Sequence, residues 1–413
     1  MLASQRHPGA RLRLVLGAFG DPGHAFPMIA LARALVDRGH DVHLQTWKRW
    51  QRAVQAEGMT FLAAPEYHVF PTRSRPLKPY EAAVRAAREM APQVAELAPD
   101  AVVADILTLG PALAGELAGR PVATLIPHVH PVSAEGFPIY SLGARIPRTA
   151  PGRRLWRSLE GLPRRGLEQG RDELNETRRR LGLPGLPHLH GGISTQLALV
   201  ATFPQLEYPR RWPSHVRVVG PLMWEPPAAA VELPPGEDPL VLVAPSTSQD
   251  PYHRLVEAAL RGLSGAPVRV LATLNGPPAR PLPVPGNARL VDWLSYSRTM
   301  PHCDVVVCHA GHGTVMRALS HGCAVVACPA AGDMNENAAR IDWAGVGVRL
   351  PARFVAPRPL RLAVLRALGD PSLKARAGQL AAWAANHDGA ELAAELIEGL
   401  AGKPTPDAVL RPA

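Results

Sequence analysis

Two histidines stand in glycine-containing bends after short apolar runs, a setting in which an imidazole can act on a ligand. The first is His24, at the end of the stretch "GAFGDPGH" that follows the apolar run Leu12–Gly17. A helix N-terminus disfavours a protonated imidazole, so a histidine there can act as a base near neutral pH. Taken alone, His24 could equally do no more than cap the turn between a strand and a helix.

A carboxylate that could assist His24 is Asp105, which comes directly after the apolar run Ala101–Ala104. If the two runs form parallel strands, both side chains reach the same edge of the sheet. The carboxylate could then accept the second ring N–H, fix the tautomer and stabilise the imidazolium. Alternatively, Asp105 caps the next helix, and we expect the two roles to require different conformers.

The second bend is "HAGHGT", which begins at His309 after the apolar run Val305–Cys308. Gly311 and Gly313 allow the backbone to approach a ligand, and Thr314 can cap the helix that follows. Backbone N–H groups and the helix dipole then form an anion site suited to a diphosphate, with His309 donating to a phosphate oxygen. Structural packing of the histidine is the alternative, because Gly-x-Gly after a strand is weak evidence alone.

Two further segments offer ligand contacts. The stretch "CPAAGDMNENAARID" presents short polar side chains that suit sugar hydroxyls, among them Asp333, Asn335, Glu336 and Asn337, although a plain polar loop has the same composition. Trp293, in "RLVDWLSYS", has a flat ring that could stack on a nucleotide base or pack in the core.

Short apolar runs alternate with helical patterns along the chain, which predicts βα units and parallel sheets. In the first half the expected strands are Leu12–Gly17, Val42–Thr46, Thr60–Ala64, Ala101–Ala104, Val122–Ile126, Leu197–Thr202 and Val216–Val219. In the second half they are Leu240–Ala244, Val268–Leu274, Ala288–Val291, Val305–Cys308, Ala324–Cys328 and Gly347–Leu350.

A proline-rich stretch separates the two halves and predicts a semi-rigid linker over residues 221–239. We therefore expect an α/β protein with two doubly wound domains, residues 1–220 and 240–390, and a C-terminal helix and tail over 391–413. In such sheets ligands bind outside the carboxyl ends of the strands, so the site should lie in a cleft between the domains.

Length and composition agree with this organisation. A chain of 413 residues exceeds one ordinary core, and 46% hydrophobic residues suit a globular protein. No apolar run is long enough for a membrane helix, and the N-terminal run reads as a first core strand, which predicts a cytoplasmic protein.

The net charge of +10 is spread along the chain, which disfavours a nucleic-acid partner. The exception is 145–180, with eleven arginines against five acids. We favour a solvated amphipathic helix beside an acceptor pocket over a patch that contacts anionic lipid.

Cofactor and metal sites are disfavoured by two patterns. The first bend has G-x-x-G-x-x-G instead of G-x-G-x-x-G, and no acid ends the second strand, which argues against NAD or FAD. The four cysteines do not have the usual zinc spacing, so we expect buried small residues instead of a metal site or disulfide. They are Cys303, Cys308, Cys323 and Cys328.

In order and spacing, four motifs resemble those of the family 1 nucleotide-sugar glycosyltransferases with the GT-B fold, particularly bacterial enzymes of natural-product glycosylation. The motifs are "GHAFPMIALARALVDRGHDVHLQT", "VLVAPSTSQ", "HAGHGT" and "PAAGDMNENAAR". The resemblance covers nearly the whole chain. It implies inverting hexosyl transfer from a UDP- or dTDP-sugar to a small apolar acceptor of natural-product, polyketide or phenolic type.

The resemblance also implies a role for each matching residue. His24 is implied as the base that deprotonates the acceptor, with Asp105 as its partner. The positions implied to bind the donor are Ser246 and Thr247 near the diphosphate, Trp293 at the base, His309, Gly311, Gly313 and Thr314 around the diphosphate, and Asp333 and Asn337 at the sugar. No metal or other cofactor is implied, because the helix N-terminus and His309 can stabilise the departing diphosphate.

Two positions depart from the family pattern. Arg317 stands where the family often has a glutamate for ribose hydroxyls, which makes a dTDP donor tolerable, and Met334 replaces the usual Gln, which makes a deoxygenated sugar or a shifted pose more plausible. The alternatives are a non-catalytic homologue that binds or activates a partner, and a lipid-acceptor enzyme at the membrane surface. The sequence is compatible with a monomer or a homodimer.

Overall fold

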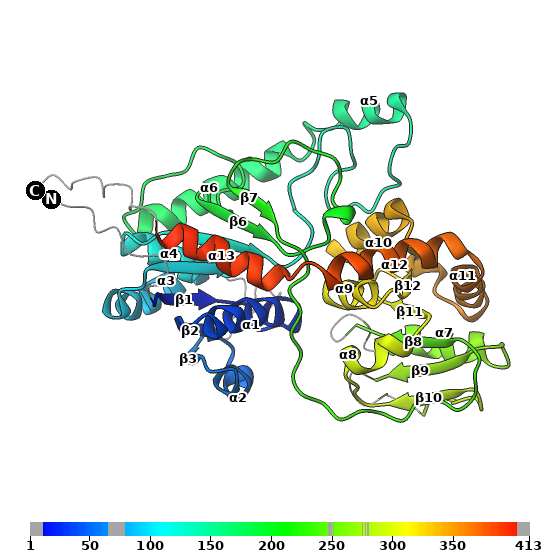
Figure 1. Cartoon of the computed structure of the whole chain (residues 1–413). Coiled ribbons are helices and arrows are strands. Elements are labelled where there is room, and N and C mark those ends of the chain that lie inside the picture. The colour runs from blue at the N-terminus through cyan, green and yellow to red at the C-terminus, as the bar shows by residue number, and fades with distance from the viewer. Residues whose placement is uncertain are drawn as a thin grey trace, which may run out of the picture.

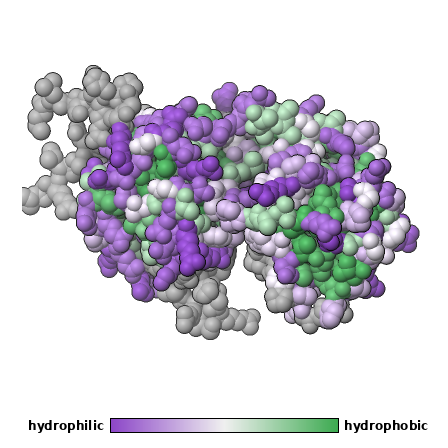
Figure 2. Space-filling view, turned by 60° about the horizontal axis from the view of Figure 1, so that its bottom comes forward, coloured by the Kyte–Doolittle hydropathy of each residue, from purple (hydrophilic) through white to green (hydrophobic). Residues whose placement is uncertain are grey.

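The computed structural model describes residues 11–64, 79–246, 250, 252–274, 276, 278 and 281–402. It contains two parallel sheets, each flanked by helices, in two lobes side by side (Figure 1). The expected α/β class with two doubly wound domains is confirmed, and a strand occurs at each expected position. Figure 2 shows a notch between the two lobes.

The first sheet has the order β3-β2-β1-β4-β5-β6-β7. Its strands are β1 (Arg13–Gly17), β2 (Asp41–Thr46), β3 (Thr60–Ala63), β4 (Ala101–Asp105), β5 (Val122–Ile126), β6 (Leu197–Val200) and β7 (Val216–Val218). The helices of this half are α1 (Pro22–Asp37), α2 (Gln51–Ala56), α3 (Pro79–Leu97), α4 (Leu109–Leu117), α5 (Ala150–Ser158) and α6 (Arg164–Arg180), with short 3-10 turns η1 (Lys48–Trp50) and η2 (Pro204–Leu206).

The second sheet has the order β10-β9-β8-β11-β12-β13. Its strands are β8 (Leu240–Ala244), β9 (Arg269–Thr273), β10 (Ala288–Val291), β11 (Val305–Cys308), β12 (Ala324–Ala327) and β13 (Gly347–Arg349). The other elements of the second half are α7 (Arg254–Leu263), α8 (Tyr296–Thr299), η3 (Met300–His302), α9 (His312–Ser320), α10 (Asp333–Ala344), η4 (Ala352–Phe354), α11 (Pro357–Gly369), α12 (Pro371–Ala385) and α13 (Gly389–Ala401).

In each sheet the strand order reverses between two neighbouring strands. These are β1 and β4 in the first sheet and β8 and β11 in the second. The register pairs Gly17 with Ala104, so the bend after β1 lies beside the end of β4. Such reversal points are where open parallel sheets bind ligands.

The last helix returns to the first domain. Figure 1 shows α13 in red crossing to lie along α1, and Ala393, Ala394, Ile397 and Leu400 join the core cluster beneath the first sheet. Arg38, just after α1, donates hydrogen bonds to Glu398 at 2.7 and 2.8 Å and to Glu391 at 3.0 Å.

The two halves also share a core across their boundary. Phe203 and Leu206, which follow β6, are buried in the cluster that includes Leu240, Leu242 and Val325 of the second sheet. Their burial holds the end of the first domain against the second, because separation of the two would expose these side chains to water. No described helix is long and apolar enough to cross a membrane.

Candidate active site

His24 and Asp105 form a hydrogen-bonded pair at the edge of the first sheet. His24 is the third residue of α1, and its Nδ1 lies 2.7 Å from Oδ2 of Asp105. Asp105 is buried, with only 1% of its surface exposed. A carboxylate accepts, so Nδ1–H is the donor and the tautomer leaves a lone pair on Nε2. The pair therefore has the geometry of a general base with its orienting carboxylate.

Asp105 makes a second contact from the same conformer. Its Oδ1 accepts a hydrogen bond from the backbone N–H of Leu107 at 2.7 Å, while Oδ2 faces His24. Helix α4 begins later, at Leu109, with Thr108 at its N-cap. Asp105 therefore does not cap the next helix, which was the alternative role, and its two oxygens bind the turn and His24 in one conformer.

The environment of His24 makes the imidazole a stronger base. Burial lowers the pKa of His24, whereas the charge of Asp105 and the hydrogen bond to it raise this pKa, as do Asp21 and Asp333 to a smaller extent. The raising effects are together the larger, so the pKa of His24 lies above its ordinary value. The helix N-terminus was expected to disfavour the protonated ring, but the pKa of His24 is raised, because Asp105 is in direct contact with it.

The second bend carries an unusual backbone. Ala310 has φ of +62°, in the left-handed region, and its carbonyl accepts a hydrogen bond from Nδ2 of Asn337 at 2.9 Å. Gly311 is the N-cap and α9 begins at His312, so Thr314 lies in the first turn and does not cap the helix as expected. The structure therefore has Asn337 holding the backbone of the bend in place.

Gly311 is required by space and not by its backbone conformation. Its φ is −62°, which any residue adopts, but a Cβ at this position would run into the ring of His309. The Nδ1 of His309 lies 3.5 Å from the carbonyl oxygen of Ala244, and burial lowers the pKa of His309. This histidine is therefore neutral where His24 is basic.

His312, the second histidine of "HAGHGT", joins the domains. Its Nε2–H donates to the carbonyl oxygen of Ala201 at 3.0 Å, and burial lowers its pKa to about 3. No role for this residue was predictable from the sequence, since its partner lies 111 positions away. A small cavity of about 20 Å³ confirms the proximity of the two bends, because Pro22 and Gly23 of α1 line it together with His312 and Gly313 of α9.

The other predicted donor contacts that the structure describes follow strands of the second sheet or begin α10. Ser246, 5% exposed, follows β8, and Trp293 follows β10 with 52% of its surface exposed. Asp333 is the first residue of α10. Its negative charge acts to raise the pKa of both His24 and His309, so this carboxylate lies near both bends. Thr247 and the stretch 65–78 of the first half lie outside the described residues.

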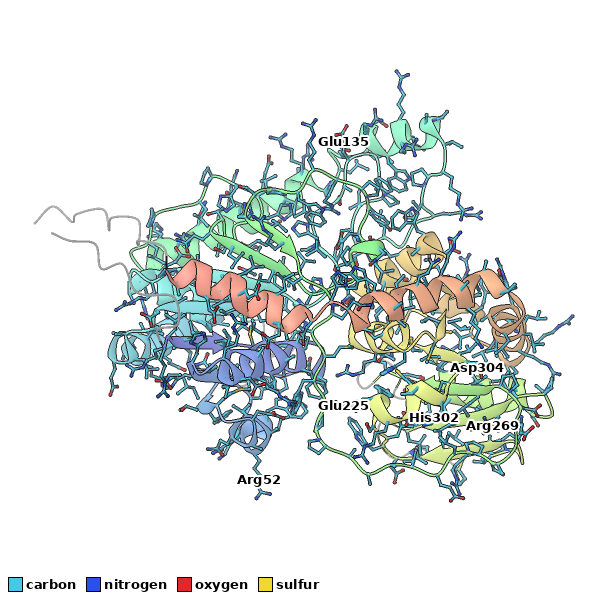
Figure 3. All side chains as sticks on the ribbon, in the orientation of Figure 1. Arg52, Glu135, Glu225, Arg269, His302 and Asp304 are labelled. Carbon is cyan, nitrogen blue, oxygen red and sulfur yellow. The ribbon has the colours of Figure 1, made fainter. Side chains whose placement is uncertain are left out.

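Arg317 points at the linker, which the sequence did not predict. Its guanidinium donates to the carbonyl oxygens of Trp224 and, at 3.3 Å, of Gly313, and lies 3.6 Å from Glu225. Figure 3 labels Glu225 where the linker passes between the lobes. Glu225 also accepts hydrogen bonds from the hydroxyls of Ser295 and Ser297, so the linker is tied to the start of α8.

A buried ion network fixes α10 against the first domain. Arg340, 1% exposed, donates to Glu207 at 2.8 Å and to Glu336 at 2.9 Å, and it also donates to the carbonyl oxygen of Leu206. Breaking one partner of such a network leaves an uncompensated buried charge. Through this network, the helix that begins with Asp333 is held in a fixed position relative to the first sheet.

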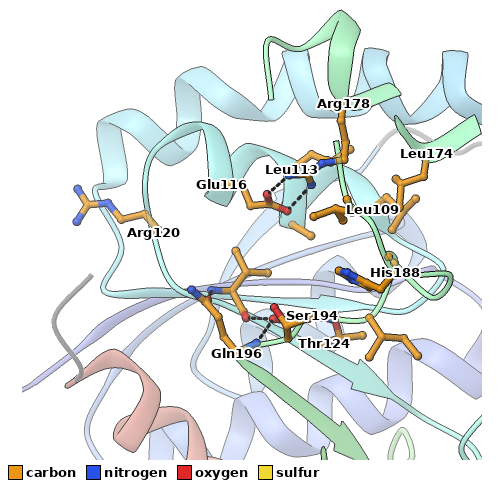
Figure 4. A pocket seen from close by; sticks show the side chains of 17 residues that line it. Leu109, Leu113, Glu116, Arg120, Thr124, Leu174, Arg178, His188, Ser194 and Gln196 are labelled. Carbon is orange, nitrogen blue, oxygen red and sulfur yellow. Dashed lines mark hydrogen bonds and ion pairs between the residues drawn. The ribbon is translucent and has the colours of Figure 1, made fainter. Parts of the chain in front are cut away.

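Other features lie apart from the two bends. A pocket of about 160 Å³ lies among α4, α6 and the segment before β6, where Arg178 pairs with Glu116 and His188 is among the lining residues (Figure 4). The four cysteines are buried and unpaired, as expected. Among the described residues, no group of three or more His, Cys, Asp or Glu side chains could hold a metal ion.

The chain is similar in sequence to known proteins. Residues 271–399 match the family model described as erythromycin biosynthesis protein CIII-like, C-terminal domain. The chain is 31% identical to the 4'-demethylrebeccamycin synthase of Lentzea aerocolonigenes, over 95% of this chain and 100% of that protein.

Solved structures show the same fold. The calicheamicin glycosyltransferase CalG4 matches with a TM-score of 0.74 at 20% identity, over 96% of this chain and 100% of that one. The glycosyltransferase VinC, solved in complex with dTDP, matches with a TM-score of 0.66 at 18% identity, over 94% and 98%. On this fold and this sequence similarity, the chain belongs to the GT-B nucleotide-sugar-dependent glycosyltransferases of natural-product type.

Proposed function

We propose that this glycosyltransferase moves a hexose or deoxyhexose from a dTDP- or UDP-sugar to a small apolar acceptor, with inversion at the anomeric carbon and without a metal ion. The observation that carries the proposal is the pair of His24 and Asp105, 2.7 Å apart, at the edge of the first sheet that meets the bend of the second. A base on one side of a cleft and an anion cradle on the other suit a single displacement.

In this mechanism Nε2 of His24 takes the proton from the acceptor while the acceptor atom attacks the anomeric carbon. The imidazolium that forms is stabilised by Asp105, which also keeps the ring from rotating. The bond from the anomeric carbon to the diphosphate oxygen breaks on the opposite face, which produces inversion. Attack and departure occur in one step, so no covalent sugar–enzyme intermediate forms.

The departing diphosphate is stabilised by the second bend. Free backbone N–H groups at the start of α9 and the helix dipole stabilise the developing negative charge, and His309 adds a donor through Nε2–H when its Nδ1 gives up the 3.5 Å contact with the carbonyl oxygen of Ala244. Preorganised donors of this kind supply the electrostatic stabilisation that a metal ion supplies in other transferases. Activity should therefore survive EDTA.

The donor proposal draws on two residues and one relative. Arg317 is committed to Glu225 and the linker and stands where the family often has an acid for ribose hydroxyls, so a donor with one ribose hydroxyl fewer is favoured. VinC was solved with dTDP, which agrees with that preference. Met334 cannot donate a hydrogen bond to a sugar hydroxyl, which favours a deoxygenated sugar.

The acceptor proposal draws on the rings around His24. Phe19 lies edge-on to His24 with ring centroids 6.0 Å apart, and it packs on Trp47 at 4.9 Å. Aromatic walls beside a base suit a flat apolar acceptor whose one reactive atom meets the imidazole. We infer an aromatic natural product or polyketide, consistent with the named relatives.

The test is a donor panel on the purified protein, with UDP- and dTDP-sugars compared sugar by sugar through thermal shift and slow donor hydrolysis. Transfer to a hydroxyaryl library follows with the best donor, and the anomeric proton coupling in the product gives its stereochemistry. We expect dTDP-sugars to stabilise the protein most and the configuration to be inverted. Preference for UDP-sugars would refute the donor assignment, and a retained configuration would refute the mechanism.

A further inference from the structure

A third histidine, His128, lies beside the proposed base. It follows β5, which is the neighbour of β4, so it reaches the same edge of the sheet as Asp105. Its ring centroid lies 6.3 Å from that of His24, at an angle of 80°, and 6.4 Å from that of Tyr140. Neither the sequence motifs nor the proposed mechanism uses this residue.

The tautomer of His128 is fixed by its backbone. Nδ1 lies 2.8 Å from the carbonyl oxygen of Val129, and a carbonyl only accepts, so Nδ1–H is the donor and Nε2 keeps its lone pair. Within the described part of the chain, Nε2 of His128 has no hydrogen-bond partner. The ring therefore offers one acceptor atom that the protein itself leaves unused.

His128 is not a second base. Burial lowers its pKa, and the neighbouring His24 lowers it further, so the ring stays neutral. Unlike His24, it has no carboxylate hydrogen-bonded to its ring, and its partner is an uncharged carbonyl. A neutral imidazole with one available lone pair binds a proton donor but does not take the proton away.

Two ring lone pairs therefore lie within one small region of the cleft, one basic and one not. Building on the proposed function, we propose that His128 accepts a hydrogen bond from a second O–H or N–H of the acceptor, next to the atom that His24 deprotonates. The acceptors that fit are those with two adjacent hydrogen-bond donors, such as a catechol, a vicinal diol or a hydroxyaryl with a neighbouring N–H.

A hydroxyl of the donor sugar has the same chemistry and is the alternative ligand, because Asp333 contributes to the pKa of His128 as well. The acceptor is favoured, since His128 and Tyr140 both belong to the first domain, whereas Asp333 begins a helix of the second. Donor hydrolysis without acceptor separates the two, because only a sugar contact affects it.

The experiment compares matched acceptor pairs, each a hydroxyaryl with and without an adjacent hydroxyl, on wild type, His128→Phe and His128→Gln. Phenylalanine keeps the ring without the lone pair, and glutamine restores an acceptor oxygen. We expect His128→Phe to lower kcat/KM about tenfold for the dihydroxy member and less than about twofold for the monohydroxy member, with partial recovery in His128→Gln. Melting temperature and dTDP-sugar hydrolysis should stay unchanged.

Each other outcome has one meaning. An equal loss for both members of a pair, or unchanged rates for both, overturns the inference while leaving the glycosyl transfer intact. A raised KM for donor hydrolysis in His128→Phe assigns the residue to the sugar and also overturns it. Failure of wild type to turn over any donor overturns the proposed function instead, so the two failures are distinguishable.

Discussion

The bends after β1 and β11 both lie beside the point where the strand order of their sheet reverses, although β11 corresponds in position to β4 and β8 to β1, and each bend places a histidine at the edge of its sheet. Their chemistry differs. His24 contacts a carboxylate and its pKa is raised, whereas His309 faces a backbone carbonyl and burial lowers its pKa. Each sheet thus carries an imidazole at this edge, and the neighbour of each ring decides whether its pKa is raised or lowered.

The two bends also differ in which of their groups, side chain or backbone, are presented to a ligand. The first leads into α1 through an Asp-Pro-Gly sequence and exposes a side chain, while the second is held by Asn337 at a left-handed Ala310 and exposes N–H groups. One bend works through a titrating side chain and the other through fixed backbone dipoles. A substitution in one bend should leave the other bend intact, so the unchanged bend serves as the reference.

Replacing His24 with alanine should have the largest effect. Removal of the base should lower kcat for O-transfer by about 10²- to 10⁴-fold. Nucleotide-sugar binding, measured by calorimetry, should remain within about threefold of wild type, because the second bend is untouched. Turnover at the wild-type rate would refute the assignment of His24 as the base.

Asp105→Asn should have a smaller effect on rate and a characteristic effect on pH dependence. In wild type, activity should rise with pH through the raised pKa of His24, since the neutral ring is the active form. Without the carboxylate, burial is opposed only by the smaller contributions of Asp21 and Asp333, and the midpoint of the pH–rate profile should move to lower pH as kcat falls by about 10²-fold. A midpoint that stays in place would show that Asp105 does not tune His24.

Gly311→Ala tests the second bend, with Gly313→Ala as its matched control. A Cβ at position 311 would collide with His309, whereas at 313 its nearest neighbour is Nη1 of Arg317 at 3.4 Å. We expect Gly311→Ala to raise the Kd for the nucleotide diphosphate about tenfold and to leave the pH midpoint unchanged. Gly313→Ala should melt like wild type, and weaker diphosphate binding there would report direct contact with the ligand.

Arg317→Gln should have the smallest effect on rate and a measurable effect on stability. Glu225 and the carbonyl oxygen of Trp224 would lose a charged donor, which costs about 1–3 kcal/mol of unfolding free energy. The control is Arg164→Gln, which removes an exposed pair with Glu168 and should cost under about 1 kcal/mol. Equal midpoints in urea for both variants would contradict a role for Arg317 in holding the linker.

The proximity of His24 and Asp105 was predictable from the sequence because each residue follows a recognisable strand. Parallel strands bring their carboxyl ends to one edge, so a histidine and an aspartate that each follow a strand must meet there. The same argument predicted His309 and Gly311. The assignment of Thr314 as a cap was wrong by one helical turn, since cap position depends on backbone angles that the sequence does not specify.

Contacts between distant segments were not predictable. His312 donates a hydrogen bond to Ala201, and Arg317 pairs with Glu225. These partners are separated by 111 and 92 residues, and the hydrophobic pattern of the sequence does not indicate such contacts. The proline-rich composition of the linker predicts a spacer, and nothing in it indicates that Glu225 pairs with Arg317 of α9. His128 escaped notice because its significance depends on the ring of His24, 104 positions earlier in the chain.

The C-terminal helix has a consequence for recombining this chain with others. α13 follows the second domain in the sequence but packs beneath the first sheet, where Glu398 accepts a hydrogen bond from Arg38 at the end of α1, the helix that carries His24 in its first turn. A hybrid enzyme made by joining halves at the linker would carry a foreign last helix against α1. Chimeras that exchange the second domain should therefore use two crossover points, the second before Gly389, so that the final helix stays with the first domain on which it packs.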